Sequence, residues 1–454
     1  MSEKSNLEHP EWPEWFDGKR INEPGFCDAY LATHRLAFTA NAFFTPEGRV
    51  DDLNILREEI CRMIRPYTFS SVTKKVTSIM DLLQMMACKG DLPPQPDRIH
   101  LKNGTLFLDG RYVSGKSEIV RSRFPVEYTP GAPEPERWLR FLNDLLWPED
   151  IPTLQEYIGY CLIPSNAGQK MMIIKGNGGE GKSLIGSVLF KLFGVNAKDG
   201  SIGKVSENAF ARADIEHVLL MIDDDMRLEA LKQTNYVKSI VTSQGKMDLE
   251  RKGKQSYQGW MFARLLAFSN GDLESLYDRS DGFYRRQLIL TTRGKRPDRV
   301  DDPFLSDKLC EELPGIFNWA FEGLKRLAAN GFRFTESERS RLSRENAKRS
   351  SNNILLFLEA KGYLRFDPNA RIYSRDLGRL YQYWCYQNAY PPVKNKTLTE
   401  FFVAHQEELG ITYTNHLLTR DMREVRGFRG MGPALPLSSL NSGWGQPEPT
   451  EDQE

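Results

Sequence analysis

The segment from residue 176 to residue 183 restricts the fold of this chain most strongly, because its glycines suit only a few kinds of loop. It matches the pattern G-x-x-x-x-G-K-[ST], and its residues are Gly176, Asn177, Gly178, Gly179, Glu180, Gly181, Lys182 and Ser183. An apolar run at 171–174 precedes it, and residues 184–193 have the composition of a helix that ends at Gly194. A strand, such a loop and a helix in this order predict a phosphate-binding loop.

The residue types of the loop indicate how it would hold a nucleotide. Its glycines let backbone N–H groups point at phosphates, and the helix N-terminus adds partial positive charge. Lys182 would reach the β- and γ-phosphates, and the Ser183 hydroxyl would ligate Mg²⁺. We expect ATP rather than GTP, because residues 395–398 lack the acid of the guanine-reading Asn-Lys-x-Asp pattern. A glycine-rich turn with a chance lysine is the alternative.

Composition narrows the class of protein. The 454 residues suffice for about three domains, and 40% apolar residues suffice for a sizeable core. A net charge of zero excludes a simple nucleic-acid coat protein, which would be strongly basic. It does not exclude nucleic-acid binding through local basic stripes. The six cysteines form no C-x-x-C pair, which argues against a zinc site or a disulfide framework. No targeting segment or membrane span is visible, so we expect a soluble, intracellular protein without membrane contact.

The pattern of apolar runs and breakers predicts an α/β fold with a parallel sheet. Residues 26–90 look helical, and the aromatic start around Trp12, Trp15 and Phe16 is expected to cap its own domain. Short strands follow at 99–128, and helices follow at 136–147 and 152–162. The expected segments are a helical region at 1–98, a preceding domain at 99–165, a nucleotide domain at 166–330, a small α+β module at 335–432 and a disordered tail at 433–454.

Carboxylates follow the apolar run at 218–222. Ligands of parallel sheets bind beyond the carboxyl ends of the strands, which is where Asp223 and Asp224 would lie. We assign Asp223 to Mg²⁺, through water, and Asp224 to the attacking water; a register one residue later stays open. The alternative is an acidic helix N-cap after a core strand.

A strand-end amide follows the next apolar run. Residues 265–268 lead into Ser269 and Asn270. An amide beside the γ-phosphate would hold the lytic water and report hydrolysis. An ordinary turn is the alternative, since Asn-Gly is a common turn dipeptide.

Paired arginines, Arg285 and Arg286, stand directly before the apolar run at 287–290. They are costly to bury without an anionic partner. An arginine finger inserted into the ATP site of a neighbouring subunit would provide that partner and contribute about 10³-fold or more to turnover. Surface salt bridges are the alternative.

A basic hairpin is predicted at residues 244–256. Its positive side chains are Lys246, Arg251, Lys252 and Lys254, and Gly253 lies at the tip. Lysine and arginine neutralise nucleic-acid phosphates without reading sequence. A solvated charged turn is the alternative.

The order of these features along the chain resembles the order of motifs in superfamily 3 helicases: the loop comes first, then the acids, the basic hairpin, the asparagine and the arginines. Superfamily 3 helicases are hexameric AAA+-type motors of viruses, phages and plasmids. The chain looks most like the helicase part of phage and plasmid primase-helicases of the poxvirus type, over about 99–430. Residues 99–106 and 154–160 resemble the domain before the motor. Residues 380–385 and 427–430 resemble the C-terminal winged-helix-like module.

The resemblance implies a homo-oligomeric, hexameric ring that uses ATP and Mg²⁺ to translocate 3′ to 5′ on single-stranded DNA. Such a ring unwinds forked DNA during replication of a phage, prophage or plasmid in the cytoplasm of a bacterial host. By this resemblance, Lys182 and Ser183 bind phosphate and Mg²⁺, Asp223 and Asp224 form the second nucleotide motif, and Asn270 is the sensor of the nucleotide. DNA contact is implied for Arg251, Lys252 and Lys254. Arg285 or Arg286 is the arginine finger that acts in trans, with Arg279 as a helper.

One departure concerns priming. Bifunctional members carry a primase domain, but only 98 residues precede residue 99 here. Their nearest acid pair, Asp51 and Asp52, suits a helix N-cap better. We therefore do not expect primase activity in this chain. The rival hypotheses are an ATP-switched initiator or loader that opens an origin, and a helicase-primase whose priming is minimal or comes from a partner chain.

Overall fold

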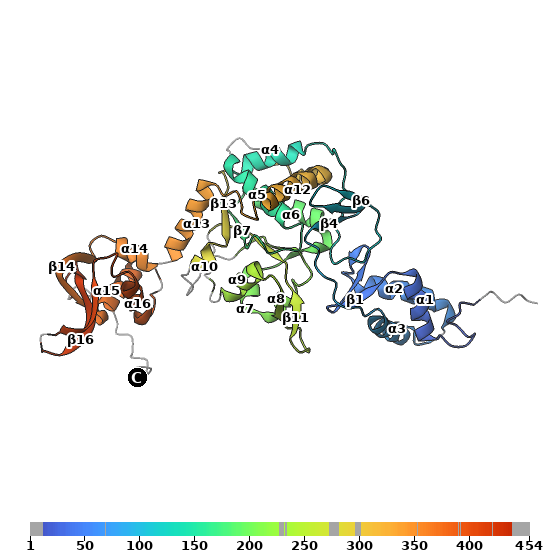
Figure 1. The fold of residues 1–454 in the computed structure, drawn as a ribbon, viewed down its shortest axis with the longest axis horizontal. Coiled ribbons are helices and arrows are strands. Elements are labelled where there is room, and N and C mark those ends of the chain that lie inside the picture. Colours follow the sequence, from blue (N-terminus) through green and yellow to red (C-terminus); the bar gives the residue numbers. More distant parts are fainter. Residues whose placement is uncertain are drawn as a thin grey trace, which may run out of the picture. The chain divides into compact units, whose positions relative to one another are not determined.

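The computed structural model describes residues 12–68, 70–226, 231, 234–271, 281–295, 301–351, 353–388, 390, 392–419 and 421–437. The chain divides into two compact units, Met1–Arg344 and Glu345–Glu454 (Figure 1). Within the described residues, no helix combines the length and the apolar character needed to cross a membrane.

A five-stranded sheet forms the centre of the first unit and confirms the α/β prediction. All its strand pairs are parallel, and the order is β13-β7-β12-β9-β8. The strands are β7 (Met171–Lys175), β8 (Ala197–Asp199), β9 (Leu220–Asp223), β12 (Arg264–Ser269) and β13 (Gln287–Thr291). Four of them coincide with the predicted apolar runs. Because β12 lies between β7 and β9, the asparagine at its end is adjacent to the glycine-rich loop that follows β7.

Helices cover both faces of this sheet, because successive side chains of each strand point to opposite sides. Met172 and Ile174 of β7 belong to one hydrophobic core, and Met171 and Ile173 belong to the other. The first core includes α4 (Glu136–Leu145), α5 (Ile151–Tyr160), α6 (Lys182–Phe193), α11 (Leu305–Cys310) and α12 (Leu313–Ala329). The second includes α7 (Ile202–Glu207), α8 (Ala209–Ala213), α9 (Asn235–Thr242) and α10 (Asp281–Tyr284).

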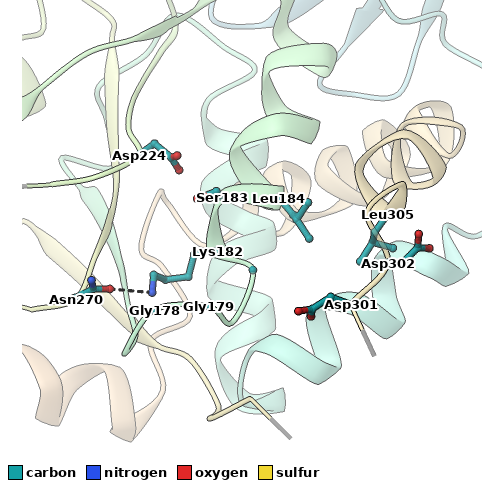
Figure 2. Close-up of a pocket in the computed structure, with 11 residues that line it drawn as sticks. Gly178, Gly179, Lys182, Ser183, Leu184, Asp224, Asn270, Asp301, Asp302 and Leu305 are labelled. Carbon is teal, nitrogen blue, oxygen red and sulfur yellow. Dashed lines mark hydrogen bonds between the residues drawn. The ribbon is translucent and has the colours of Figure 1, made fainter. Parts of the chain in front are cut away.

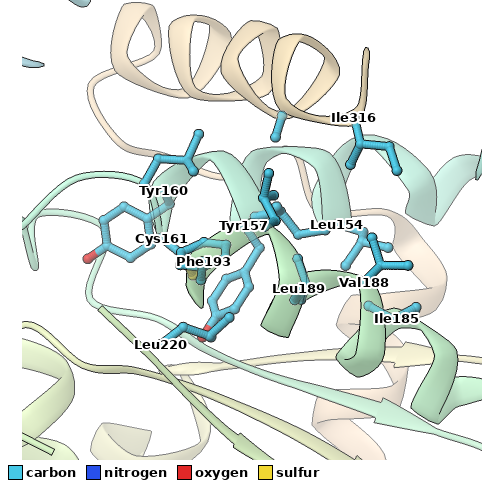
Figure 3. Close-up of a cluster of buried hydrophobic side chains, with 14 of the residues drawn as sticks. Leu154, Tyr157, Tyr160, Cys161, Ile185, Val188, Leu189, Phe193, Leu220 and Ile316 are labelled. Atoms are coloured by element: carbon cyan, nitrogen blue, oxygen red, sulfur yellow. The ribbon is translucent and has the colours of Figure 1, made fainter. Parts of the chain in front are cut away.

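The first core fixes the helix that follows the glycine-rich loop. Figure 3 shows Leu154 and Tyr157 of α5 close to Val188 and Leu189 of α6. The Tyr157 hydroxyl also donates a hydrogen bond to the Leu265 carbonyl of β12, at 2.7 Å. Since a Cβ at Gly159 would lie 2.3 Å from a carbonyl oxygen of α12, α5 and α12 pack almost backbone to backbone. Helices α5 and α12 therefore form one closely packed layer, which shares its hydrophobic core with α6.

The region before the sheet contains helices and two small antiparallel sheets. The second of these, β4-β5-β6, confirms the strands predicted within 99–128. As predicted, Trp15 packs within its own domain, against Phe26 and Tyr67, and Asp52 caps a helix by accepting the Asn54 N–H. The elements are α1 (Glu23–Thr33), β1 (Ala37–Thr39), β2 (Ala42–Thr45), β3 (Gly48–Arg49), α2 (Leu53–Ile64), α3 (Val72–Met86), β4 (Arg98–Leu101), β5 (Gly104–Phe107) and β6 (Tyr112–Ser114), with single 3-10 turns at Arg65–Tyr67, Pro148–Asp150 and Gly194–Asn196.

The prediction of helix was wrong for residues 37–49, which form β1-β2-β3. Ala40 and Asn41 both have positive φ, 48° and 60°, and make the two-residue turn between β1 and β2. Two left-handed residues in succession favour a tight hairpin and end any helix. The apolar residues Phe43 and Phe44 are compatible with either period, so only the turn distinguished the two structures.

The second unit combines helices with a three-stranded antiparallel sheet of order β14-β16-β15. Trp384 and Phe428 lie in its hydrophobic core. The elements are α14 (Asn353–Glu359), β14 (Leu364–Tyr373), α15 (Ser374–Gln387), α16 (Asn395–Ala404), β15 (Thr412–Leu418) and β16 (Glu424–Pro433), and α13 (Glu338–Ser351) crosses the boundary between the units.

The predicted disordered tail begins too early. Pro433 ends β16, and Leu435 and Leu437 pack against the core of the second unit. The prediction of disorder rested on the proline and glycine content of this stretch and overlooked its two apolar residues at alternate positions. Residues 438–454 lie outside the described residues.

Candidate functional site

A cavity of about 380 Å³ lies at the carboxyl ends of the sheet strands (Figure 2). It is bounded by the glycine-rich loop, the start of α6, the ends of β9 and β12, and the start of α11. Its lining residues are Gly178, Gly179, Gly181, Lys182, Ser183, Leu184, Asp224, Asn270, Asp301, Asp302 and Leu305. The loop, one of the predicted acids and the predicted asparagine therefore share one cavity.

Backbone geometry explains the glycines of the loop. Gly178, Gly179 and Gly181 have φ of 98°, 77° and 102°, which side-chain-bearing residues rarely adopt. Gly176 is required for space, because a Cβ there would lie 2.2 Å from the Thr292 hydroxyl. The loop can therefore close tightly and turn its N–H groups inward.

Lys182 and Ser183 begin α6, at the positive end of its dipole. The Lys182 side chain is 9% exposed, and its Nζ lies 3.3 Å from Asn270 Oδ1, as the dashed line in Figure 2 marks. The ammonium thus donates a hydrogen bond to the amide oxygen at one side of the cavity. The pairing follows from the strand order, since β12 is the neighbour of β7.

Glu180 was predicted as one of the nucleotide-binding residues of the loop, and in the structure its carboxylate is buried inside the loop. It accepts hydrogen bonds from the N–H groups of Asn177, at 2.5 Å, and Gly178, at 2.9 Å. Lys182 Nζ lies 3.1 Å from it. Burial alone would raise the pKa of Glu180, but hydrogen bonds from Lys182 and from the N–H groups of Glu180 itself and Asn177 outweigh burial and lower its pKa. The carboxylate is therefore ionised at neutral pH.

The two predicted acids point in different directions. Asp224 lines the cavity. Asp223 does not line it, and its carboxylate accepts the Ile202 N–H at 2.7 Å. Burial raises the pKa of Asp223, and the neighbouring acids Asp199, Asp225 and Asp224 add to the rise. This geometry favours the register that is one residue later, with Asp224 as the acid facing the cavity.

Sequence reasoning missed Asp301 and Asp302 on the far wall of the cavity. Asp302 caps the following turn by accepting the Phe304 N–H at 3.0 Å, and its carboxylate lies 2.6 Å from Lys308. An acid pair before a helix was a visible signal, but it stands about 120 residues after the loop in the sequence. Only the packing of α11 against α6 brings it to the cavity.

The arginine pair lies at the end of the sheet opposite the cavity, where the strands begin. Arg285 and Arg286 precede β13, whose strand direction is parallel to that of β7. They therefore stand at the amino ends of the strands, one strand length or roughly 16 Å from the carboxyl ends. Arg285 is exposed, and Arg286 donates to the Gly282 carbonyl. Neither lines the cavity of its own chain, and Arg279 lies outside the described residues.

The basic hairpin is present, as predicted. Strands β10 (Lys246–Leu249) and β11 (Tyr257–Trp260) pair antiparallel, and Gly253 at the tip has a φ of 74°. Lys252 is exposed there. Arg251 lies 2.9 Å from the buried carboxylate of Glu216, so this arginine already has an anionic partner.

The hairpin also contacts the N-terminal region. Lys246 Nζ lies 2.8 Å from Asp91, which accepts a second hydrogen bond from the indole of Trp260 at 2.7 Å. Lys254 donates to the side chain of Asn41, in the β1-β2 turn. Three of the four predicted DNA contacts are thus paired within the chain, and they must exchange partners to reach a phosphate.

The donor set of the cavity suits a magnesium–nucleotide complex better than a metal alone. No group of three or more His, Cys, Asp or Glu in the described ranges could hold a metal ion. The hydroxyl of Ser183 and the carboxylate of Asp224 line the same cavity. Mg²⁺ commonly binds to one or two protein oxygens and completes its shell with water and substrate phosphates.

Comparisons with known proteins show a shared fold. Residues 174–286 match a family model described as a family of unknown function, DUF5906. A solved apo structure of the NrS-1 C terminal region aligns with a TM-score of 0.51 and 11% identity, covering 91% of this chain and 100% of that one. An A form apo structure of the same region gives 0.50 and 10%, covering 90% and 99%. The curated proteins contain no match to this chain.

Proposed function

We propose that this chain is an ATP-dependent DNA helicase with a phosphate-loop motor of the AAA+ type. The observation that carries the proposal is the convergence of Lys182, Asn270 and Asp224 on one cavity beside the glycine-rich loop. Lysine and backbone N–H groups would hold the phosphates, and the amide would hold the attacking water. Ser183 and Asp224 would hold Mg²⁺, which neutralises charge on the phosphates when it is bound.

The arginine pair supports action as a ring. Because Arg285 and Arg286 stand at the edge of the sheet away from their own cavity, they can reach an ATP site only in a neighbouring copy. We therefore propose a homo-oligomer, with a hexameric ring as the form implied by the superfamily 3 resemblance. In such a ring each cavity is completed by an arginine in trans.

The basic hairpin and the second unit supply the proposed DNA contacts. Lys252 is exposed at a glycine-containing tip, which suits a mobile contact with phosphates. A three-stranded antiparallel sheet with α14, α15 and α16 supports a winged-helix-like module. The substrate we propose is single-stranded and forked DNA, followed 3′ to 5′, during replication of a phage, prophage or plasmid in the bacterial cytoplasm.

ATP turnover with and without single-stranded DNA tests this proposal. We expect hydrolysis that rises when DNA is added and that Lys182→Ala lowers about a hundredfold or more, because the phosphates lose a charged hydrogen-bond donor. Lys191→Ala is a matched control on the exposed side of the same helix. An absence of nucleotide binding would contradict the proposal. Hydrolysis that DNA does not change would contradict the DNA part alone.

A further inference from the structure

The carboxylate of Glu180 lies where the glycine-rich loop presents its donors. One oxygen accepts the Asn177 N–H, and the other accepts the Gly178 N–H and lies beside Lys182 Nζ. The Glu180 side chain is only 3% exposed. Two converging backbone N–H groups and an ammonium are the donors that such a loop offers to a phosphate. In this structure they bind an anion that belongs to the chain itself.

We propose that Glu180 is an internal ligand of the phosphate site, which occupies the loop between nucleotides and competes with a nucleoside polyphosphate for the same donors. The inference rests on the proposed function, because it assumes that this loop binds nucleotide.

The geometry of the loop favours this role over a purely structural one. The positive φ of Gly178, Gly179 and Gly181 already curves the backbone, so the carboxylate is not needed to shape the turn. Lys182 has a second acceptor, Asn270, at 3.3 Å. A carboxylate and a phosphate cannot share these donors, because two buried like charges in contact repel strongly. Binding of a nucleotide must therefore expel the Glu180 side chain.

Two consequences follow for the nucleotide cycle. The apparent affinity equals the intrinsic affinity multiplied by the fraction of molecules in which Glu180 has left the loop. The internal ligand therefore weakens binding of both ATP and ADP. As a diphosphate begins to leave, the carboxylate can take over its hydrogen bonds, so the internal ligand also speeds release.

The test compares Glu180→Gln with the wild-type chain, using ADP and ATP as probes. Glutamine keeps the size of the side chain but carries no charge, so it competes poorly. We expect ADP to bind about tenfold more tightly and to leave more slowly, since a charged hydrogen bond is exchanged for a neutral one. Glu207→Gln, at an exposed position of α7 outside the cavity, is the matched control and should change neither value.

A second measurement needs no nucleotide. Hydrogen exchange of the peptide that contains residues 176–183 should be faster in Glu180→Gln, because a glutamine amide has one acceptor oxygen in place of two and cannot accept from both the Asn177 and the Gly178 N–H groups. Unchanged or weaker ADP binding would overturn the inference, even if exchange became faster. If neither protein binds nucleotide, the proposed function fails, and unchanged exchange would then overturn the role of Glu180 as well.

Discussion

At the scale of single residues, orientation separates Asp223 from Asp224. The sequence places them side by side at the end of β9, and only the structure shows that Asp224 lines the cavity while Asp223 accepts the Ile202 N–H. The roles of neighbouring acids depend on which way each side chain leaves the strand end. Orientation also matters for Glu180, whose carboxylate turns toward the backbone N–H groups of Asn177 and Gly178.

Substitution of each acid by asparagine tests this distinction. We expect Asp224→Asn to lower ATP turnover about a hundredfold while nucleotide binding is retained, as for loss of a group that acts on the reacting water or its metal. Asp223→Asn should retain most of the turnover, because its amide oxygen still accepts the Ile202 N–H. The reverse pattern in steady-state turnover would restore Asp223 as the acting acid.

The pH dependence of stability gives an independent measure for Asp223. Burial raises the pKa of its carboxyl above the ordinary 3.8, so the folded chain holds this proton more tightly than the unfolded chain does. Its favourable contribution is complete below the ordinary pKa and is lost as pH rises through the raised pKa. Asp223→Asn should therefore flatten the fall in melting temperature that this group causes as the pH rises above its ordinary pKa of 3.8. An unchanged slope would contradict the raised pKa.

At the scale of elements, the basic hairpin is held by the N-terminal region through Asp91 and Asn41. Burial alone would raise the pKa of Asp91, but hydrogen bonds from Lys246 and Trp260 and the charge of Arg121 outweigh it and lower its pKa. The acid therefore stays charged and keeps Lys246 paired. Lys252 at the tip is the basic side chain that needs no rearrangement to meet a phosphate.

Salt-dependent DNA binding tests the tip of the hairpin. We expect Lys252→Ala to weaken binding of single-stranded DNA and to reduce the slope of log K against log salt by about 0.7, the value for one phosphate contact on a single strand. Lys74→Ala, on an exposed position of α3, should leave the slope unchanged. Equal slopes for Lys252→Ala and the wild-type chain would place the DNA elsewhere.

The predictable elements were those with local signals. Four sheet strands, the glycine-rich loop, α6 and the basic hairpin follow from runs of apolar residues and from glycines that the backbone requires. The β1-β2-β3 sheet was missed because Phe43 and Phe44 fit a helical or a strand period and only the Ala40-Asn41 turn decides between them. Asp301 and Asp302 were missed because the packing of α11 brings them to the cavity from a distant part of the sequence.

At the scale of the whole molecule, Arg285 and Arg286 lie too far from the cavity of their own chain to act there, so we expect them to act on ATP in a neighbouring chain. We expect Arg285→Ala or Arg286→Ala to lower turnover about 10³-fold without loss of ATP binding. Whichever arginine variant lowers turnover should regain part of its activity when it is mixed with Lys182→Ala, because some cavities then receive an intact loop from one chain and an intact arginine from another. No recovery on mixing, in chains shown to assemble, would argue against an arginine in trans.

The most direct test of the central claim is displacement of a strand from forked DNA with ATP and Mg²⁺. We predict that the wild-type chain and Lys191→Ala separate the strands over many turnovers and that Lys182→Ala does not; forks with a single tail then give the polarity. ATP hydrolysis without strand displacement would contradict the helicase account and would favour an ATP-switched initiator or loader.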